Sequence, residues 1–457
     1  MTRNIYRIIA FAALAVSAAS CGIYGSYRQA DSVPDNLYGD TVQTGDTTNF
    51  GNLDWKEVFA DTCLQSLIER GLANNTDYLT AQYRVQEAEA TLSAAKLSFL
   101  PSFALSPQGT VSGGESQPNA SWTWQAPVTA SWEVDIFGRL RNAKEQAKAL
   151  YAQSEDYRQA VRSQLIAGIA NTYYTLLMLD AQLDVSRQTA EAWKETVNSA
   201  EALMNAGQYD QAAISQMEAT YYSVQASVLD LEEQINQAEN SMALLLAETP
   251  RHYVRGKLSE QVFPEDLSVG IPVQMLSNRP DVRSAEHALA AAFYATNQAR
   301  SAFYPSIVLS GSAGWTNQLG AAIVNPAQFI ASAVGALTMP LFNRGLNKAQ
   351  LKIAEAQQEE ASLAFQQALL NAGTEVNNAV KACQTSRSKT ILYEKQIESL
   401  RTALQSTSLL MEYGNRTYLE VLTARQTLLS AELSQIANRF AEMQSVVNLY
   451  QALGGGR

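Results

Sequence analysis

The sequence contains two copies of one unit, and this duplication restricts the possible folds more than any other feature. Residues 74–77 and 99–106 return as residues 278–281 and 303–310, both shifted by 204 positions. A further match, between residues 203–207 and 410–414, is shifted by 207 positions. Chance similarity between Ala-rich helices would not keep register across proline, glycine and phenylalanine. We infer that one unit was copied and later gained a small insertion.

Each copy is predicted to contain the same elements in the same order. A first helix covers residues 63–98 and 280–302, and Pro101 and Pro305 end it and open extended chain. Two strand-like segments follow. A long helix then runs over residues 140–205 and 346–413 to Gly207 and Gly414, and a returning helix covers residues 210–247 and 418–453. At ~1.5 Å per residue each long helix would be roughly 100 Å long, more than a compact domain holds.

These elements give a predicted division of the chain into segments. Residues 1–20 are a signal peptide and residues 21–60 an extended N-terminal segment. The remaining segments are a first repeat at 61–247 with strands at about 102–136, a proline-containing connector at 248–276, a second repeat at 277–453 with strands at about 305–341, and a C-terminal tail at 454–457.

The start of the chain is typical of a bacterial lipoprotein. Arg3 and Arg7 precede a short apolar run, and small residues lead up to Cys21. The run is shorter than the roughly 20 residues that a membrane-spanning helix needs. We therefore expect Cys21 to become the acylated first residue of the mature protein. Ala18 stands where lipoprotein signals usually have leucine, and the alternative is an ordinary secreted protein. Gly22, rather than aspartate, after the cysteine favours the outer membrane.

Composition excludes several classes of function. The net charge is −11 and no run of basic residues occurs, so we expect no nucleic-acid partner. Three cysteines do not form a disulfide framework and two histidines are too few for a His-based metal site. No phosphate-binding loop is present, and Gly311–Gly314 lacks the earlier glycine of a nucleophile elbow. We expect neither enzymatic activity nor a cofactor.

The strand-like segments carry the argument for a membrane. Residues 122–136 alternate without a break, with Trp122, Trp124, Val128 and Trp132 on one face and polar residues on the other. A transmembrane barrel strand needs roughly 9 to 11 residues of this pattern. Four of the six tryptophans lie in such segments, as in an interfacial aromatic belt. The alternative is a half-buried sheet of a water-soluble protein.

Four strands cannot close a transmembrane barrel, because about eight are the minimum and open edges are not tolerated in lipid. If the strands span the membrane, the chain must oligomerise. Two, three or four copies would give 8, 12 or 16 strands, and the pattern alone does not choose among them.

Several motifs together resemble the TolC family of outer-membrane efflux channels, in its OprM/NodT-like lipoprotein branch. The resemblance covers nearly the whole mature chain. The motifs on which the resemblance rests are residues 131–139 (Ser-Trp-Glu-Val-Asp-Ile-Phe-Gly-Arg), 278–282 with 285–286, 303–306, 340–342, 418–425 (Tyr-Leu-Glu-Val-Leu-Thr-Ala-Arg) and 449–456.

The resemblance implies a mainly α-helical fold with a small transmembrane β part. It implies a homotrimer with a 12-strand barrel in outer-membrane lipid and a long periplasmic helical barrel. It also implies two partners, a periplasmic adaptor protein and an inner-membrane pump of the resistance-nodulation-division (RND) type. With them the chain would act as a passive exit duct for small toxic molecules. The alternative function is a lipid-anchored structural or surface-binding coiled-coil protein of the cell envelope.

The resemblance also points to an aperture formed by the helix hairpins. In OprM-like relatives a leucine and an aspartate narrow the pore; here Leu419 matches the leucine, and Thr423 takes the place of the acid. Leu419 and Thr423 are four residues apart and so share a helical face, whereas Glu420 lies about 100° round the helix. In the alternative, Leu419 packs between helices and closure depends on hairpin contacts. The expected hairpin-tip and adaptor-contact residues are Gly207, Asp210, Tyr413, Gly414 and Arg416.

Overall fold

The structure is a computed structural model that describes residues 24–29, 33, 36–39, 49–114, 117–205, 210–264, 268–270, 272–319, 322–413 and 418–456. The chain forms two compact units. The first contains Arg84–Glu155, Ser284–Gln366 and the described part of Met1–Ala30, and the second contains Asp156–Arg283, Gln367–Arg457 and the described part of Asp31–Tyr83.

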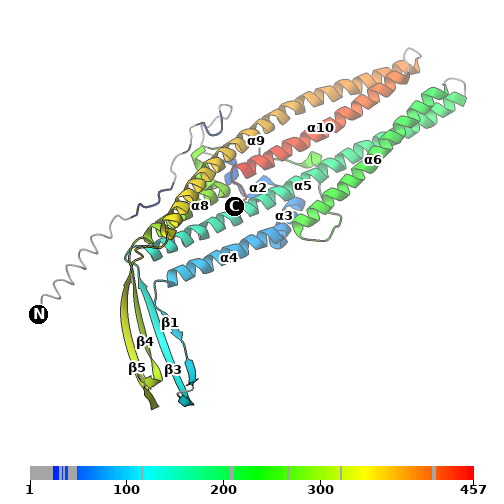
Figure 1. The fold of residues 1–457 in the computed structure, drawn as a ribbon. Coiled ribbons are helices and arrows are strands. Elements are labelled where there is room, and N and C mark those ends of the chain that lie inside the picture. The colour runs from blue at the N-terminus through cyan, green and yellow to red at the C-terminus, as the bar shows by residue number, and fades with distance from the viewer. Residues whose placement is uncertain are drawn as a thin grey trace. The chain divides into compact units, whose positions relative to one another are not determined.

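The first unit contains one antiparallel sheet to which both copies of the repeat contribute. Its strands are β1 (Ser102–Leu105), β2 (Gln108–Gly114), β3 (Gln117–Val134), β4 (Ser306–Leu319) and β5 (Ala322–Thr338). The first copy supplies β1, β2 and β3, the second supplies β4 and β5, and β3 pairs with β4 in the middle of the sheet (Figure 1). The pairing places Ser131 opposite Ser310 and runs without a register shift from Gln125 opposite Thr316 to Val134 opposite Ile307.

The expected first strand is present but interrupted. Residue pairing with β3 continues in the same register from Leu105, opposite Val128, to Gln108, opposite Gln125. Pro107 and Pro127 fall within this gap, and neither has a backbone N–H to give to the ladder. The sheet therefore follows the expected four-strand plan, with its first strand divided into β1 and β2.

The long helices match the sequence expectations closely. They are α5 (Arg139–Asn205) and α9 (Leu346–Glu412), and the returning helices are α6 (Gln211–Leu246) and α10 (Tyr418–Ala452). Gly138 and Gly345 precede the long helices with positive φ angles of 72° and 78°, a conformation that glycine adopts without strain. No helix in the described part of the chain is long and apolar enough to cross a membrane.

The prediction of one unbroken helix over residues 63–98 is wrong. The structure has α3 (Thr62–Asn74) and α4 (Thr76–Leu97), because Asn75 leaves the helical conformation at φ −59°, ψ 127°. Its amide donates to the Leu245 carbonyl oxygen at 3.0 Å, and its Oδ1 accepts from the Tyr78 N–H at 2.9 Å. The second copy breaks at the matching position, Arg279, between α7 (Met275–Asn278) and α8 (Pro280–Ser301).

The core of the second unit surrounds the middle of α5. Ile169, Tyr173 and Leu176 are fully buried there. The short helix α2 (Trp55–Val58), α3, the end of α6 and the end of α10 supply the surrounding apolar side chains, including Trp55, Leu64, Ile68, Leu246, Met443 and Val447. Between the repeats, the connector contains the 3-10 turns η2 (Leu258–Glu260) and η3 (Pro272–Gln274).

Because β3 lies close to β4 at Gly314, we predict that any larger residue at this position destabilises the sheet. A Cβ atom at this position would collide with the Ala126 carbonyl and lie 2.5 Å from Pro127 Cα. We expect Gly314→Ala to destabilise the sheet by about 1–3 kcal/mol, the usual range for overpacking. The measurement is the temperature at which the purified protein loses the amide I infrared band of its β-sheet. Gly311→Ala is the control, since its Cβ would meet Ser332 O at 3.5 Å, an ordinary contact. Equal melting of the two variants would refute this packing argument.

Candidate functional site

The candidate aperture lies where α5–α6 and α9–α10 form two helix pairs. The structure describes four of the residues expected there: Asp210, Tyr413, Leu419 and Thr423. The other three, Gly207, Gly414 and Arg416, lie outside the described residues, as does the expected lipid anchor Cys21.

Asp210 and Tyr413 differ in the contacts that their side chains make within the chain. Asp210 is the N-cap of α6, and its carboxylate accepts a hydrogen bond from the Ala213 N–H at 2.8 Å. This role is local, because such a cap stabilises a helix start by about 1 kcal/mol. The Tyr413 side chain is 79% exposed, so it does not contribute to the packing of the chain.

Leu419 and Thr423 share an exposed face at the start of α10. Leu419 is 56% exposed, and the Thr423 hydroxyl donates to the Leu419 carbonyl oxygen at 2.9 Å. Neither side chain packs into the cores of this unit. The face is therefore free, within one chain, to meet solvent or another molecule.

A neighbouring side of α10, about 60–100° round the helix from Leu419 and Thr423, joins the two helix pairs. Leu422 is 5% exposed and packs with Trp193 of α5 and Val224 of α6. Tyr418 touches this cluster and also a second one formed by Val197, Ala200, Ile214 and Met217. Apolar burial thus attaches the start of α10 to both α5 and α6.

One polar contact strengthens this junction. Arg425 Nη1 donates to Thr196 Oγ1 at 2.9 Å, and the Arg425 guanidinium lies 5.8 Å from the centre of the Trp193 ring. Sequence reasoning noted Arg425 only as part of a family motif and gave no role to Trp193, Thr196 or Arg425. The available signal was a tryptophan, fully buried in the structure, inside a helix otherwise rich in Ala, Gln and charged residues.

A groove of about 560 Å³ lies beside this junction, between α5, α9 and α10. Its lining includes Trp193, Arg401, Arg425 and Glu432. Arg401 pairs with Glu432 at 2.9 Å across α9 and α10, as Arg187 pairs with Glu232 at 2.6 Å across α5 and α6. These pairs are largely exposed, so each contributes about 0–1 kcal/mol, less than the apolar contacts around Trp193.

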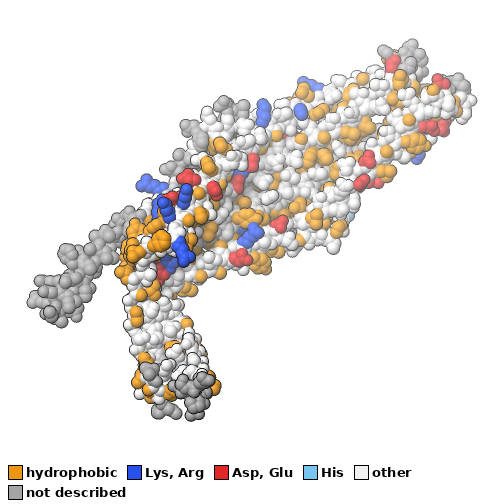
Figure 2. Space-filling view, viewed as in Figure 1, with side chains coloured by type: hydrophobic (Ala, Val, Ile, Leu, Met, Phe, Trp, Pro, Cys, Tyr) orange, Lys and Arg blue, Asp and Glu red, His pale blue; other side chains and the backbone are white. Residues whose placement is uncertain are grey.

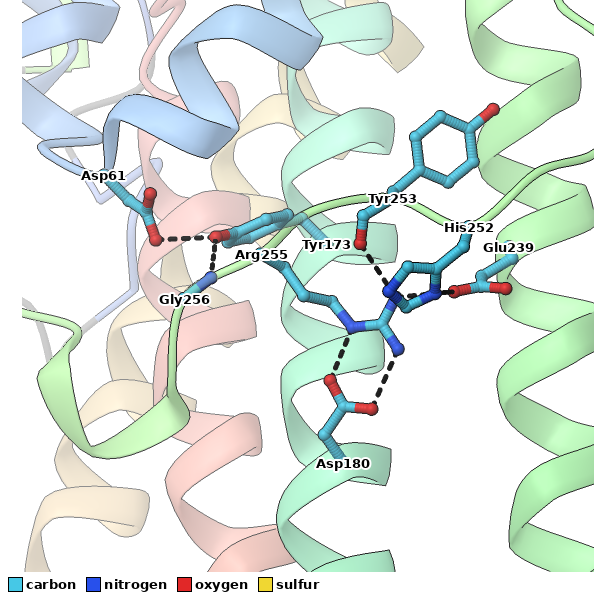
Figure 3. A network of polar contacts seen from close by, with 8 residues as sticks. All are labelled: Asp61, Tyr173, Asp180, Glu239, His252, Tyr253, Arg255 and Gly256. Carbon is cyan, nitrogen blue, oxygen red and sulfur yellow. Dashed lines mark hydrogen bonds and ion pairs between the residues drawn. The ribbon is translucent and has the colours of Figure 1, made fainter.

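A different network holds the connector to the first helix pair (Figure 3). The Arg255 side chain is 7% exposed and makes a bidentate ion pair with Asp180 of α5, at 2.5 and 2.8 Å. It also donates to Glu239 of α6 at 2.6 Å, and His252 contacts the same Glu239 oxygen at 2.7 Å. Burial alone would lower the pKa of Arg255, but the bonds to Asp180 and Glu239 raise it, so the guanidinium stays charged.

The same connector is tied to the segment before α3 through Asp61. Tyr173 donates its phenol proton to Asp61 at 2.6 Å and accepts from the Gly256 N–H at 2.9 Å, while Gln261 donates to Asp61 at 2.8 Å. Burial would raise the pKa of Asp61, yet these hydrogen bonds, with those from the Cys63 and Leu64 backbone, lower it overall. Burial, and then the bond to Asp61, raises the pKa of Tyr173, which stays a protonated donor.

The sheet of the first unit has the two-faced surface that the alternation predicted. Trp122 is 67% exposed and Trp132 is 40% exposed on one face. On the other face, hydroxyl groups pair across strands, Ser112 with Ser121 and Ser312 with Ser332, each at 2.8 Å. Glu133 is the single charged residue in the five strands, and it pairs with Arg139. A sheet with one charged residue, which is paired, and with exposed tryptophans suits lipid contact.

The two cysteines in the described part of the chain, Cys63 and Cys383, are unpaired. Within the same part, no group of three or more His, Cys, Asp or Glu side chains is arranged to hold a metal ion.

Comparison with known proteins agrees with this geometry. The family model described as "Outer membrane efflux protein" matches residues 67–248 and 271–455, one match for each repeat. The chain is 28% identical to the cation efflux system protein CusC of Escherichia coli O6:H1 over 97% of both chains. It is 27% identical to the probable outer membrane lipoprotein SilC of Salmonella typhimurium over 88% of both.

A solved structure has the same fold. The open state of the MtrE outer membrane channel of Neisseria gonorrhoeae aligns with a TM-score of 0.86 at 28% identity, covering 95% of this chain and 98% of that one. These findings confirm the resemblance that the motifs indicated. The chain belongs to the outer membrane efflux protein family and acts as an efflux channel of the outer membrane.

Proposed function

We propose that three copies of this chain form one passive exit duct, anchored in the outer membrane by acylated Cys21. A periplasmic adaptor and an inner-membrane pump of the RND type deliver small toxic molecules to it. The observation that best supports this proposal is the structure of the sheet. Its strands contain Glu133 as their single charged residue, expose tryptophans on one face and leave β5 with one neighbour, β4, within the described residues. Three copies of the four-strand plan supply the 12 strands that the family resemblance implies.

The aperture of this duct is proposed to be the exposed face of α10. Three copies of Leu419 would form an apolar ring, which resists wetting and so holds a narrow pore shut. Thr423 carries no charge, so this ring lacks the carboxylates of OprM-like relatives. Hairpin tips around Gly207, Asp210, Tyr413, Gly414 and Arg416 are the proposed adaptor contacts. The adaptor would open the ring by separating the helix pairs that Trp193 and Arg425 join.

The first test measures assembly and conduction on the purified full-length protein. We expect native mass spectrometry in detergent to give the mass of three chains, and planar bilayers to show discrete conductance steps with a low resting level. A stable monomer without conductance would instead favour the structural or surface-binding coiled-coil protein.

A second test addresses the aperture. Leu419→Ala combined with Thr423→Gly should raise the resting conductance several-fold, because the apolar ring is removed. Leu392→Ala with Thr402→Gly is the matched control: both side chains are exposed on α9, and the glycine costs the helix the same roughly 1 kcal/mol. A resting conductance as low as that of the parent, in an intact trimer, would show that closure depends on other hairpin contacts.

A third test addresses the anchor. Mass spectrometry of protein purified from its native membrane should find lipid on an N-terminal Cys21. Cys21→Ser should abolish that modification while the strands still insert. A mature chain that starts elsewhere, or that carries Cys21 without lipid, would contradict the anchor.

A further inference from the structure

Positive charge gathers in the first unit directly beyond the strands, although the chain as a whole carries a net charge of −11. The strands hold only Glu133. Figure 2 shows Lys and Arg side chains gathered beside hydrophobic ones where the sheet meets the helices of this unit. The exposed cations in question are Lys96 at the end of α4, Arg141 and Lys148 at the start of α5, and Arg344, Lys348 and Lys352 around the start of α9. We call these six residues the cationic belt.

The carboxylates near the cationic belt pair with other cations. Neighbouring cations are paired: Arg139 with Glu133, Lys144 with Glu145 at 3.1 Å, and Arg300 with Glu355 at 3.4 Å. Within the described residues, none of the six belt side chains forms an ion pair. Six unpaired cations on one small unit raise its local potential above that of the rest of this acidic chain.

Helix stability explains Lys96, in the last turn of α4, but not the cations at the starts of α5 and α9. The first turns of α5 and α9 contain no acidic residue, and cations at a helix start oppose the helix dipole by about 0.3–1 kcal/mol each. The placement nevertheless occurs in both repeats. Arg141 follows Gly138 by three residues, and Lys348 follows Gly345 by three residues. At α5 the Asp135 carboxylate caps the helix start, accepting from the Leu140 and Arg141 N–H groups at 3.0 and 2.9 Å. The Arg141 and Lys348 side chains themselves form no ion pair within the described residues, so their charges remain available to an external anion.

Exposed apolar side chains accompany the cations. Leu341 is 90% exposed and Phe342 is 87% exposed, directly before the start of α9. Phe137 stacks on Tyr304 at 5.1 Å between ring centres, and Lys144 lies 6.0 Å from the centre of the Phe99 ring. Apolar and aromatic groups beside long cationic side chains are typical of the boundary between lipid tails and headgroups, where Lys and Arg extend their charges toward phosphate.

We propose that the cationic belt binds the headgroups of anionic phospholipids in the leaflet on the helix side of the membrane. The inference rests on the proposed function to the extent that the strands span the membrane. A phosphatidylglycerol headgroup carries a net negative charge, whereas phosphatidylcholine is neutral overall. Each cation near an anionic surface contributes about 1 kcal/mol, or roughly fivefold in affinity. Binding would hold the sheet at a defined depth and make the channel prefer anionic lipid.

The test is native mass spectrometry of the purified full-length protein, titrated with phosphatidylglycerol or phosphatidylcholine of identical acyl chains. The parent should bind phosphatidylglycerol preferentially, and salt should weaken that preference. Arg141→Gln, Lys348→Gln and Lys352→Gln combined should weaken phosphatidylglycerol binding about tenfold or more and leave phosphatidylcholine binding unchanged. The charge-conserving substitutions Arg141→Lys, Lys348→Arg and Lys352→Arg should keep the preference. This result would show that the loss of charge, and not a folding defect, weakens binding in the Gln variant.

The matched control removes three cations from the second unit. Lys381, Lys389 and Lys395 are exposed on α9 and form no ion pair within the described residues, so Lys381→Gln, Lys389→Gln and Lys395→Gln should leave the lipid preference intact. Equal binding of the two lipids by the parent, or an unchanged preference in the belt variant, would overturn the proposal. So would competition by soluble glycerol phosphate as strong as that by the lipid, which would identify a free-phosphate site. Loss of conductance with the lipid preference retained would count against the channel and not against the belt.

Discussion

The backbone hydrogen bonds of the sheet impose the constraint on which the rest of the protein depends. β3 and β4 join the two repeats, but one edge of β5, and the edge of β1 and β2 away from β3, have no strand beside them within the described residues. In lipid, each unpaired N–H or C=O group costs several kcal/mol, far more than surface contacts return. If the strands span the membrane as proposed, these edges pair with other chains, and oligomerisation is then a condition of membrane insertion.

The helical unit uses two kinds of contact, and they suit different tasks. The connector is held by charged, partly buried bonds, in which Arg255 engages Asp180 and Glu239 together. Removing one partner would leave a buried charge, which is costly. The junction at the start of α10 is mainly apolar, with one hydrogen bond from the charged Arg425 guanidinium to the neutral Thr196 hydroxyl. Such contacts can separate without leaving a buried charge unpaired. The connector is thus suited to a fixed region, and the Trp193 junction to one that opens.

Long, regular elements were predictable because their signals are local and repeated. The ends of α5, α6, α9 and α10 agree with expectation to within one residue, since glycine, Asp210 and the start of each periodic run mark them. The break at Asn75 was not predictable from the same signals. Asparagine is only mildly unfavourable in a helix, and here its amide is drawn to the Leu245 carbonyl, 170 residues away. The Trp193 and Arg425 contact was missed for the same reason, because it joins helices distant in the chain.

Patterns in the amino-acid sequence established the duplicated architecture, the alternating strands, the family and the candidate face of Leu419 and Thr423. The architecture and the strands depend on spacing along the chain, which periodicity and residue type specify directly. The family and the face of Leu419 and Thr423 were recognised by the resemblance of motifs. Three-dimensional packing established which side of α10 is buried, where the connector is fastened, and which cations lack a carboxylate. Those properties depend on which distant side chains come within about 4 Å of one another. Residue order alone does not determine such distances until hundreds of residues have packed together.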